Sequence, residues 1–153
     1  MTTPSLENLT AALLEAARKA GADSADAMAV QGTSVAIDMR GGVLEQAERA
    51  EGIDLGLRVM VGQRQANVSA SDINPDTLAT MAERAVAMAR EAPLDPHVGL
   101  ADPSQLARNW DIAALEMCDP TPEPDARSMQ EDAARAEAAA LGIEGVSQVQ
   151  SAS

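Results

Sequence analysis

Residues 53–61, IDLGLRVMV, decide the fold of this chain, because their aliphatic side chains recur at every second position. Side chains of a β-strand point alternately to the two faces of a sheet. One face of the strand therefore carries Ile53, Leu55, Leu57, Val59 and Val61. The other face carries Asp54, Gly56, Arg58 and Met60. The segment predicts a strand that is buried on its aliphatic face.

The flanking sequence continues this period of two. Strands are predicted around residues 28–30, 35–39, 43–50 and 65–71, with Gly41-Gly42 and Glu51-Gly52 among the turns between them. Five consecutive strands joined by short turns favour an antiparallel meander. A further short strand is predicted at residues 112–117, and residues 146–153 alternate like the start of another. We therefore expect a mainly antiparallel sheet of five to six strands.

Three helices are predicted beside these strands. Ser5 caps the first, Asn74 caps the second, and the third extends from about Asp125 to Leu141. The sequence thus predicts an α+β fold with the helices packed on one face of the sheet. That face is expected to consist of Val35, Ile37, Leu55, Leu57, Val59 and Val68.

Composition excludes several classes of protein. The 153 residues match one domain, and 46% hydrophobic residues predict a folded core. A net charge of −13, one lysine and one aromatic residue argue against nucleic acid and anionic membranes as partners. No apolar run approaches the roughly 20 residues of a spanning helix. With a single cysteine and no leader-like start, the chain is expected to be cytoplasmic.

The inventory of reactive side chains is small. His97 is the only histidine and lies in a loop, where a solvated imidazole is a simpler interpretation than a metal ligand. Cys118 has no neighbouring base or cation, which favours a buried, inert thiol. A Cys-His nucleophilic pair would require the fold to bring these two residues together. We expect no catalytic, cofactor-binding or metal-binding residue in this chain.

The polar face of the sheet is the remaining candidate for a site. It is expected to present a peptide or partner surface that includes Arg58, Ser69, Asp38, Arg40 and Asn67. A glycine on that face would let another backbone come close. The alternative is a solvated surface on which Arg58 pairs with Asp38 or Asp54.

Several short motifs follow one another along the chain: residues 21–23, GAD, 41–45, GGVLE, 56–59, GLRV, 69–72, SASD, Pro96, 99–102, GLAD, and 119–120, DP. In this order they resemble the N-terminal domain of the TldD/PmbA family, "modulator of DNA gyrase", and specifically its PmbA (TldE) branch. The similarity runs along nearly all of the chain.

This resemblance implies that residues 1–153 are the single N-terminal domain of a longer protein, cut before its C-terminal domain. It also implies a non-catalytic part of a TldD/TldE-type metalloprotease that processes unfolded or extended peptides. The expected partner is a TldD-like metalloprotease subunit, with zinc only in that subunit or outside this chain. The charge of −13 disfavours direct contact with DNA. The alternative is a protein interaction module without a role in proteolysis.

Overall fold

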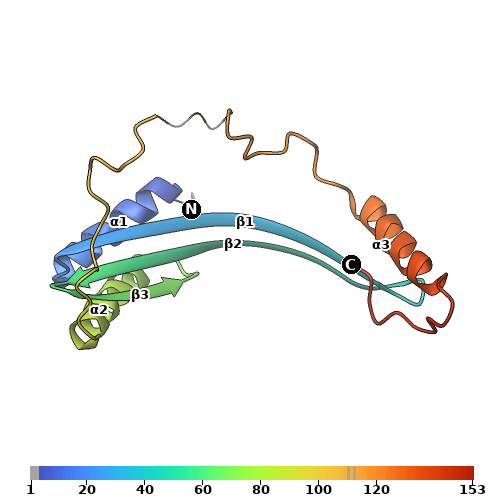
Figure 1. The fold of residues 1–153 in the computed structure, drawn as a ribbon, viewed down its shortest axis with the longest axis horizontal. Coiled ribbons are helices and arrows are strands. Elements are labelled where there is room, and N and C mark those ends of the chain that lie inside the picture. The colour runs from blue at the N-terminus through green and yellow to red at the C-terminus, as the bar shows by residue number, and fades with distance from the viewer. Residues whose placement is uncertain (1–3, 110, 112) are drawn as a thin grey trace. The chain divides into compact units, whose positions relative to one another are not determined.

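The computed structural model describes residues 4–109, 111 and 113–153. The helices and strands follow one another as α1 (Leu6–Ala20), β1 (Ser24–Arg40), β2 (Val43–Val61), β3 (Arg64–Ala70), α2 (Pro75–Glu91) and α3 (Ala126–Leu141) (Figure 1). The strands form one antiparallel sheet in the order β1-β2-β3. The fold class is α+β, but the described residues form three strands, so the prediction of five to six strands is wrong.

Two long strands replace the four short ones that were predicted in their place. β1 has 17 residues and β2 has 19, and both continue through a glycine, at Gly32 and Gly52 respectively. Turns occur instead where glycines have positive φ, at Gly41 (59°), Gly42 (74°) and Gly62 (58°). A glycine permits the left-handed backbone of a tight turn but does not impose it. The predicted turn at Glu51-Gly52 is therefore wrong.

The two additional strands are also absent from the described part of the chain. Residues 113–116 form a turn, while Ile112 lies outside the described residues. The C-terminal segment contributes one isolated bridge, in which Met39 and Ala152 exchange backbone hydrogen bonds of 2.8 and 3.0 Å. The alternation of residues 146–153 thus leads to a single pairing and not to a strand.

The chain divides into two compact units. Unit 1 comprises the described residues within 1–32 and 52–108. Its core joins α1, β2 and α2, and Leu57 is 2% exposed, which confirms the predicted burial of this residue. The buried side chains are Leu9, Leu13, Ala17, Leu55, Leu57, Val59, Ala66, Leu78, Met81, Ala82, Ala85, Val86 and Ala89. The helices α1 and α2 therefore cover the aliphatic face of β2.

Unit 2 comprises the described residues within 33–51 and 109–153 and has a separate, smaller core. Ile37 and Met39 of β1 pack with Ala133 of α3 and with Ala152. The expected single apolar face is therefore divided, because Ile37 belongs to this second cluster while Leu55, Leu57 and Val59 belong to the first.

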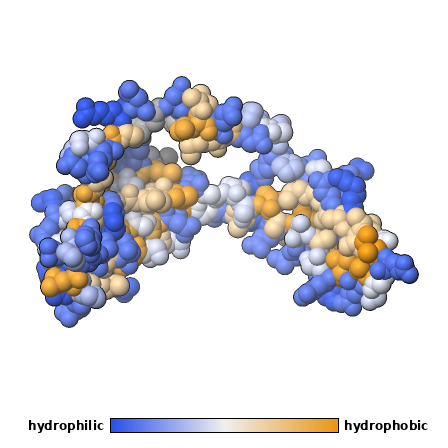
Figure 2. Space-filling view, in the orientation of Figure 1, coloured by the Kyte–Doolittle hydropathy of each residue, from blue (hydrophilic) through white to orange (hydrophobic). Residues whose placement is uncertain are grey.

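The helix ends agree with the sequence predictions. Ser5 Oγ accepts a hydrogen bond from the Asn8 N–H at 3.2 Å, and Asn74 Oδ1 accepts one from the Asp76 N–H at 3.1 Å. Asp125 Oδ1 caps α3 in the same way. Hydrophilic residues cover much of the surface visible in Figure 2. Within the described ranges, none of the helices combines the length and apolar character required to cross a membrane.

Candidate functional site

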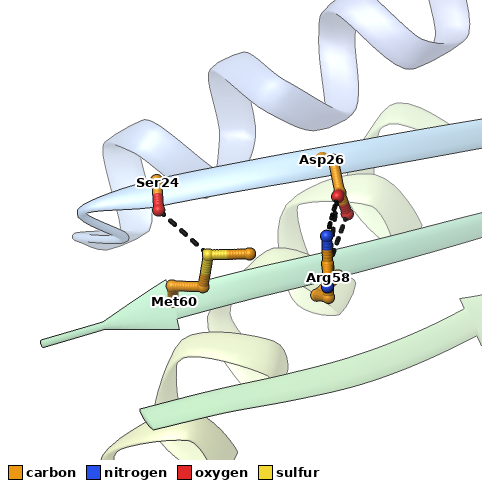
Figure 3. Close-up of polar contacts among 4 residues, drawn as sticks. All are labelled: Ser24, Asp26, Arg58 and Met60. Carbon is orange, nitrogen blue, oxygen red and sulfur yellow. Dashed lines mark hydrogen bonds and ion pairs between the residues drawn. The ribbon is translucent and has the colours of Figure 1, made fainter. Parts of the chain in front are cut away.

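Arg58 of β2 and Asp26 of β1 form an ion pair on the sheet face opposite α1 and α2, which we call the open face (Figure 3). The Arg58 Nε donates to Oδ1 and Oδ2 of Asp26 at 3.0 and 3.1 Å, and Nη2 also donates to Oδ2. The hydrogen bond to Asp26 raises the pKa of the Arg58 guanidinium. The two side chains are 36% and 48% exposed, so both remain accessible to a ligand.

A hollow of about 610 Å³ surrounds this ion pair in unit 1. Its lining includes Asp26, Met28, Gly56, Arg58, Asn67 and Ser69. The β2–β3 register accounts for this grouping, because Arg58 pairs with Asn67 and Gly56 pairs with Ser69 across the two strands. Side chains of directly opposed residues lie on the same face of an antiparallel pair. The hollow thus combines a cation, an amide and a hydroxyl.

Gly56 has no side chain, so no side-chain atoms rise from this position of β2 into the hollow. A Cβ built at this position would have Met28 Cβ as its nearest neighbour, 4.0 Å away, which is ordinary van der Waals contact. The strand itself would therefore accept a side chain at residue 56. What the glycine provides is room for another backbone to approach β2.

The structure brings three of the five predicted site residues together. Arg58, Asn67 and Ser69 line the hollow of unit 1. Asp38 and Arg40 belong to unit 2, where Asp38 Oδ1 accepts a hydrogen bond from Ser151 at 3.4 Å and Arg40 pairs with Glu45 at 3.5 Å.

Sequence reasoning missed Asp26. The alternative of a solvated surface paired Arg58 with Asp38 or Asp54, and the structure corrects the partner to Asp26. The alternation of alanines at positions 25, 27 and 29 was a signal for this placement. These alanines pack against the core, so residue 26 between them lies on the open face. On that same face Ser24 donates a hydrogen bond to Met60 Sδ at 3.1 Å. The first strand was predicted around residues 28–30, whereas β1 begins at Ser24, so Asp26 was not counted on the polar face.

Neither of the two reactive side chains is among the residues that line the hollow. His97 is exposed in unit 1, and its backbone N–H donates to Asp95 Oδ1 at 2.9 Å. Cys118 is exposed, so the expected buried thiol is wrong. Across residues 4–109, 111 and 113–153 there is no group of three or more His, Cys, Asp or Glu side chains suited to hold a metal ion. The described residues therefore do not fit a metal centre.

Known proteins match much of this chain. Residues 25–89 match the family model described as PmbA/TldA metallopeptidase domain 1, and this segment contains the whole of the open-face hollow. The protein named metalloprotease PmbA of Escherichia coli O157:H7 is 32% identical over 136 residues, which cover 89% of this chain and 29% of that relative.

Two solved structures show the same fold. A proposed modulator of DNA gyrase from Bacteroides thetaiotaomicron superposes with a TM-score of 0.72 and 19% identity, over 95% of this chain and 33% of that one. TldE from Thermococcus kodakarensis superposes with a TM-score of 0.56 and 16% identity, over 73% and 26%. The chain thus spans about a third or less of the length of each relative that it matches.

Proposed function

This chain belongs to the PmbA/TldD family, and we propose that it forms the first, non-catalytic domain of a PmbA/TldE-type metalloprotease subunit in the cytoplasm. In this proposal the open-face hollow around Arg58 holds an extended peptide for a TldD-like subunit, which supplies the metal site. The observation that carries the proposal is the hollow of unit 1, with its half-exposed cation beside Asn67 and Ser69.

The hydrogen bonds of Arg58 leave part of its guanidinium available. Its Nε and Nη2 bind Asp26, while Nη1 donates to no other described residue. The ion pair therefore fixes the orientation of the guanidinium, and Nη1 can donate to a peptide carbonyl or carboxylate. Because a charged donor makes a stronger hydrogen bond than a neutral one, this group is suited to hold a backbone without reading its sequence.

The neighbouring groups suit the same task. The Asn67 amide offers both a donor and an acceptor, and the Ser69 hydroxyl offers the same. Each is exposed on β3, on the side of the hollow away from Asp26. Gly56 lies between them and β1, which leaves space for an extended backbone. These groups recognise the polar backbone of an unfolded chain rather than any one side chain.

The metal chemistry belongs elsewhere in this proposal. The described residues contain no grouping suited to a metal ion, so zinc is assigned to the TldD-like subunit or to residues outside this chain. No step of peptide-bond cleavage is therefore assigned to the residues described. Their role is to bind and orient the peptide.

The test uses the longer subunit that this proposal implies, co-purified with its metalloprotease partner. Cleavage of an unfolded peptide is measured for wild type, Arg58→Ala and Arg18→Ala, with assembly and thermal stability matched. Arg18 provides the control, because it is an exposed arginine on α1 that pairs with Glu15. We expect KM to rise about tenfold for Arg58→Ala, the loss of one charged hydrogen bond, and to stay unchanged for the control.

A second variant distinguishes peptide binding by Arg58 from a role that is limited to its ion pair with Asp26. Asp26→Asn leaves Arg58 in place but weakens its charged partner. If Arg58 holds the peptide, this variant retains cleavage. If Arg58 only pairs with Asp26, both variants behave alike and cleavage is unchanged by either. That second result would reject the peptide role and favour a protein interaction module.

A further inference from the structure

The open-face hollow has an apolar end beside its charged one. Met28 of β1 and Gly56 of β2 line it two residues along from Asp26 and Arg58 respectively. The Met28 Cβ is the nearest atom to a Cβ built at Gly56, so these two residues are neighbours across the strands. One end of the hollow therefore presents an ion pair, and the other presents a thioether side chain beside a position without a side chain.

Met28 is highly accessible for a large apolar side chain. It is 66% exposed, and Val30, the next residue on the same face of β1, is 50% exposed. The alanines at positions 25, 27 and 29 pack against the core, so alternation along β1 directs the two larger side chains to the open face. Large apolar side chains that are exposed next to one another mark binding surfaces.

The chemistry of this end suits apolar side chains of different shapes. We call Met28 and Gly56 the apolar shelf of the hollow. Methionine is unbranched and polarisable, so it adapts to varied apolar partners and is common at surfaces that bind many sequences. Gly56 leaves room above β2 for the side chain of a ligand. The hollow of about 610 Å³ lies within the size range of sites that hold small ligands.

The charges beside the shelf disfavour an acidic side chain. Asp54 lies on the open face of β2, two residues before Gly56, and it is exposed. It forms no ion pair with another described residue. Like charges repel, so a carboxylate placed over Gly56 would be unfavourable next to Asp54. An uncharged apolar side chain avoids this repulsion, and charge thus agrees with the shape of the shelf.

The two ends of the hollow are spaced like residues of an extended peptide. Arg58 and Gly56 are two residues apart on β2, which corresponds to about 7 Å along the strand. Alternate residues of an extended peptide have the same separation. A peptide that lies along β2 can therefore place a backbone carbonyl beside the Arg58 guanidinium and a side chain over Gly56 at the same time.

We infer that the open-face hollow selects unfolded segments that carry a large, uncharged apolar side chain within two residues of the bound carbonyl. Met28 and Gly56 determine this preference. The inference rests on the proposed function, because it names the class of peptide that the same hollow holds. The charged end binds the backbone of any sequence, and the shelf adds the side-chain preference. Folded proteins bury most of their large apolar side chains, so this combination distinguishes an unfolded segment from a folded one.

The experiment compares two unfolded peptides as substrates of the longer subunit, co-purified with its metalloprotease partner. Every third residue is leucine in one peptide and the similarly shaped, polar asparagine in the other, and the remaining sequence is identical. We expect KM to be about tenfold lower for the leucine peptide, because part of one leucine side chain is buried. Met28→Asn should raise the KM of the leucine peptide to that of the asparagine peptide.

A pair of glycine variants tests the space above the shelf. Gly56→Val places a branched side chain in the hollow and should also remove the preference for leucine. Gly52→Val is the matched control, since it makes the same change in the same strand outside the hollow, where nothing lies within 4 Å of a built Cβ. This control should keep the tenfold ratio of the two KM values.

Arg58→Ala separates this inference from the proposed function. It should raise KM for both peptides by the same factor and leave their ratio unchanged. If Arg58→Ala weakens both peptides but the wild type does not distinguish them, the inference is wrong while the proposed function stands. A preference for leucine that survives in Met28→Asn and Gly56→Val would also overturn the inference. Unchanged KM values for both peptides in Arg58→Ala would reject the proposed function, and this inference with it.

Discussion

The cores of the two units differ in how they are held together. Unit 1 buries a large aliphatic cluster from α1, β2, β3 and α2, with no charged side chain among its described buried residues. Unit 2 buries only Ile37, Met39, Ala133 and Ala152 among its described residues, together with the carboxylate side chain of Glu137, which is 4% exposed. Burial of apolar area therefore dominates in unit 1. In unit 2 the hydrogen bonds of the buried Glu137 carboxylate contribute a larger share of the stability.

Glu137 makes this contribution at the β1–β2 turn. Its Oε1 accepts a hydrogen bond from the Gly41 N–H at 2.6 Å, and its Oε2 accepts one from the Gly42 N–H at 2.8 Å. Consecutive N–H groups point in the same direction here because Gly41 and Gly42 both have positive φ. One carboxylate on α3 thus satisfies both donors of the turn.

The largest effect is expected for the apolar core of unit 1. Leu57→Ala should lower the free energy of unfolding by about 2 to 5 kcal/mol, because it removes a fully packed side chain and leaves a cavity. Denaturant titration measures this change. Met28→Ala is the control from the open face, where Met28 is 66% exposed, and should cost less than about 0.5 kcal/mol. Equal losses for the two variants would contradict the assignment of the faces.

The next effect tests the polar core of unit 2. Glu137→Ala should destabilise the unit by about 1.5 to 3 kcal/mol, since it removes the charged acceptor of two backbone donors. Faster amide hydrogen exchange at Gly41 and Gly42 would report this loss directly. The control is Glu131→Ala, which removes an exposed carboxylate of the same helix that pairs with Arg127. If the amide hydrogens of Gly41 and Gly42 exchange at the wild-type rate in both variants, the stability of unit 2 does not depend on its buried carboxylate.

A smaller effect, of opposite sign, tests the continuity of β2. Gly52 lies in an extended strand with nothing within 4 Å of a built Cβ, so Gly52→Val should stabilise the chain by about 0.5 to 1 kcal/mol. Gly41→Val is the matched change in a true turn, where φ is 59°, and it should destabilise. Thermal unfolding of the two variants compares them. Destabilisation by Gly52→Val would restore the turn that was predicted at this position.

The sequence predicted the parts of the fold that depend on periodicity. The helix caps at Ser5 and Asn74, the start of α3 near Asp125 and the burial of Leu57 follow from local spacing and side-chain chemistry. The number of strands does not follow from local spacing, because glycine at positions 32 and 52 is compatible with both a turn and an extended strand. Only pairing with a neighbouring strand decides between these conformations, and pairing is not local.

The candidate site was predictable to the same extent. Arg58, Asn67 and Ser69 share a face because alternation along β2 and β3 requires it, once the two-residue turn at Gly62 sets the register. Asp26 was missed because its place opposite Arg58 depends on where β1 begins. Asp38 and Arg40 were included because alternation alone does not show that β1 passes through two units. Long strands place residues of one face in different surroundings.

The smallest effect contrasts the buried carboxylate of unit 2 with an exposed one of unit 1. Arg18 donates two hydrogen bonds to Glu15, at 2.8 and 2.9 Å, and these lower the pKa of Glu15 from 4.5 to about 2. Because the folded-state pKa is the lower one, the pair stabilises above pH 4.5 and loses its contribution as the pH falls toward 2. We expect Glu15→Gln to lower Tm slightly at pH 7 and low salt, and the difference from wild type to shrink as the pH falls toward 2 and to disappear below it. Added salt should shrink it at pH 7, since both side chains are exposed. A Tm difference that stays as large below pH 2 as at pH 7 would show that Glu15 acts through packing instead.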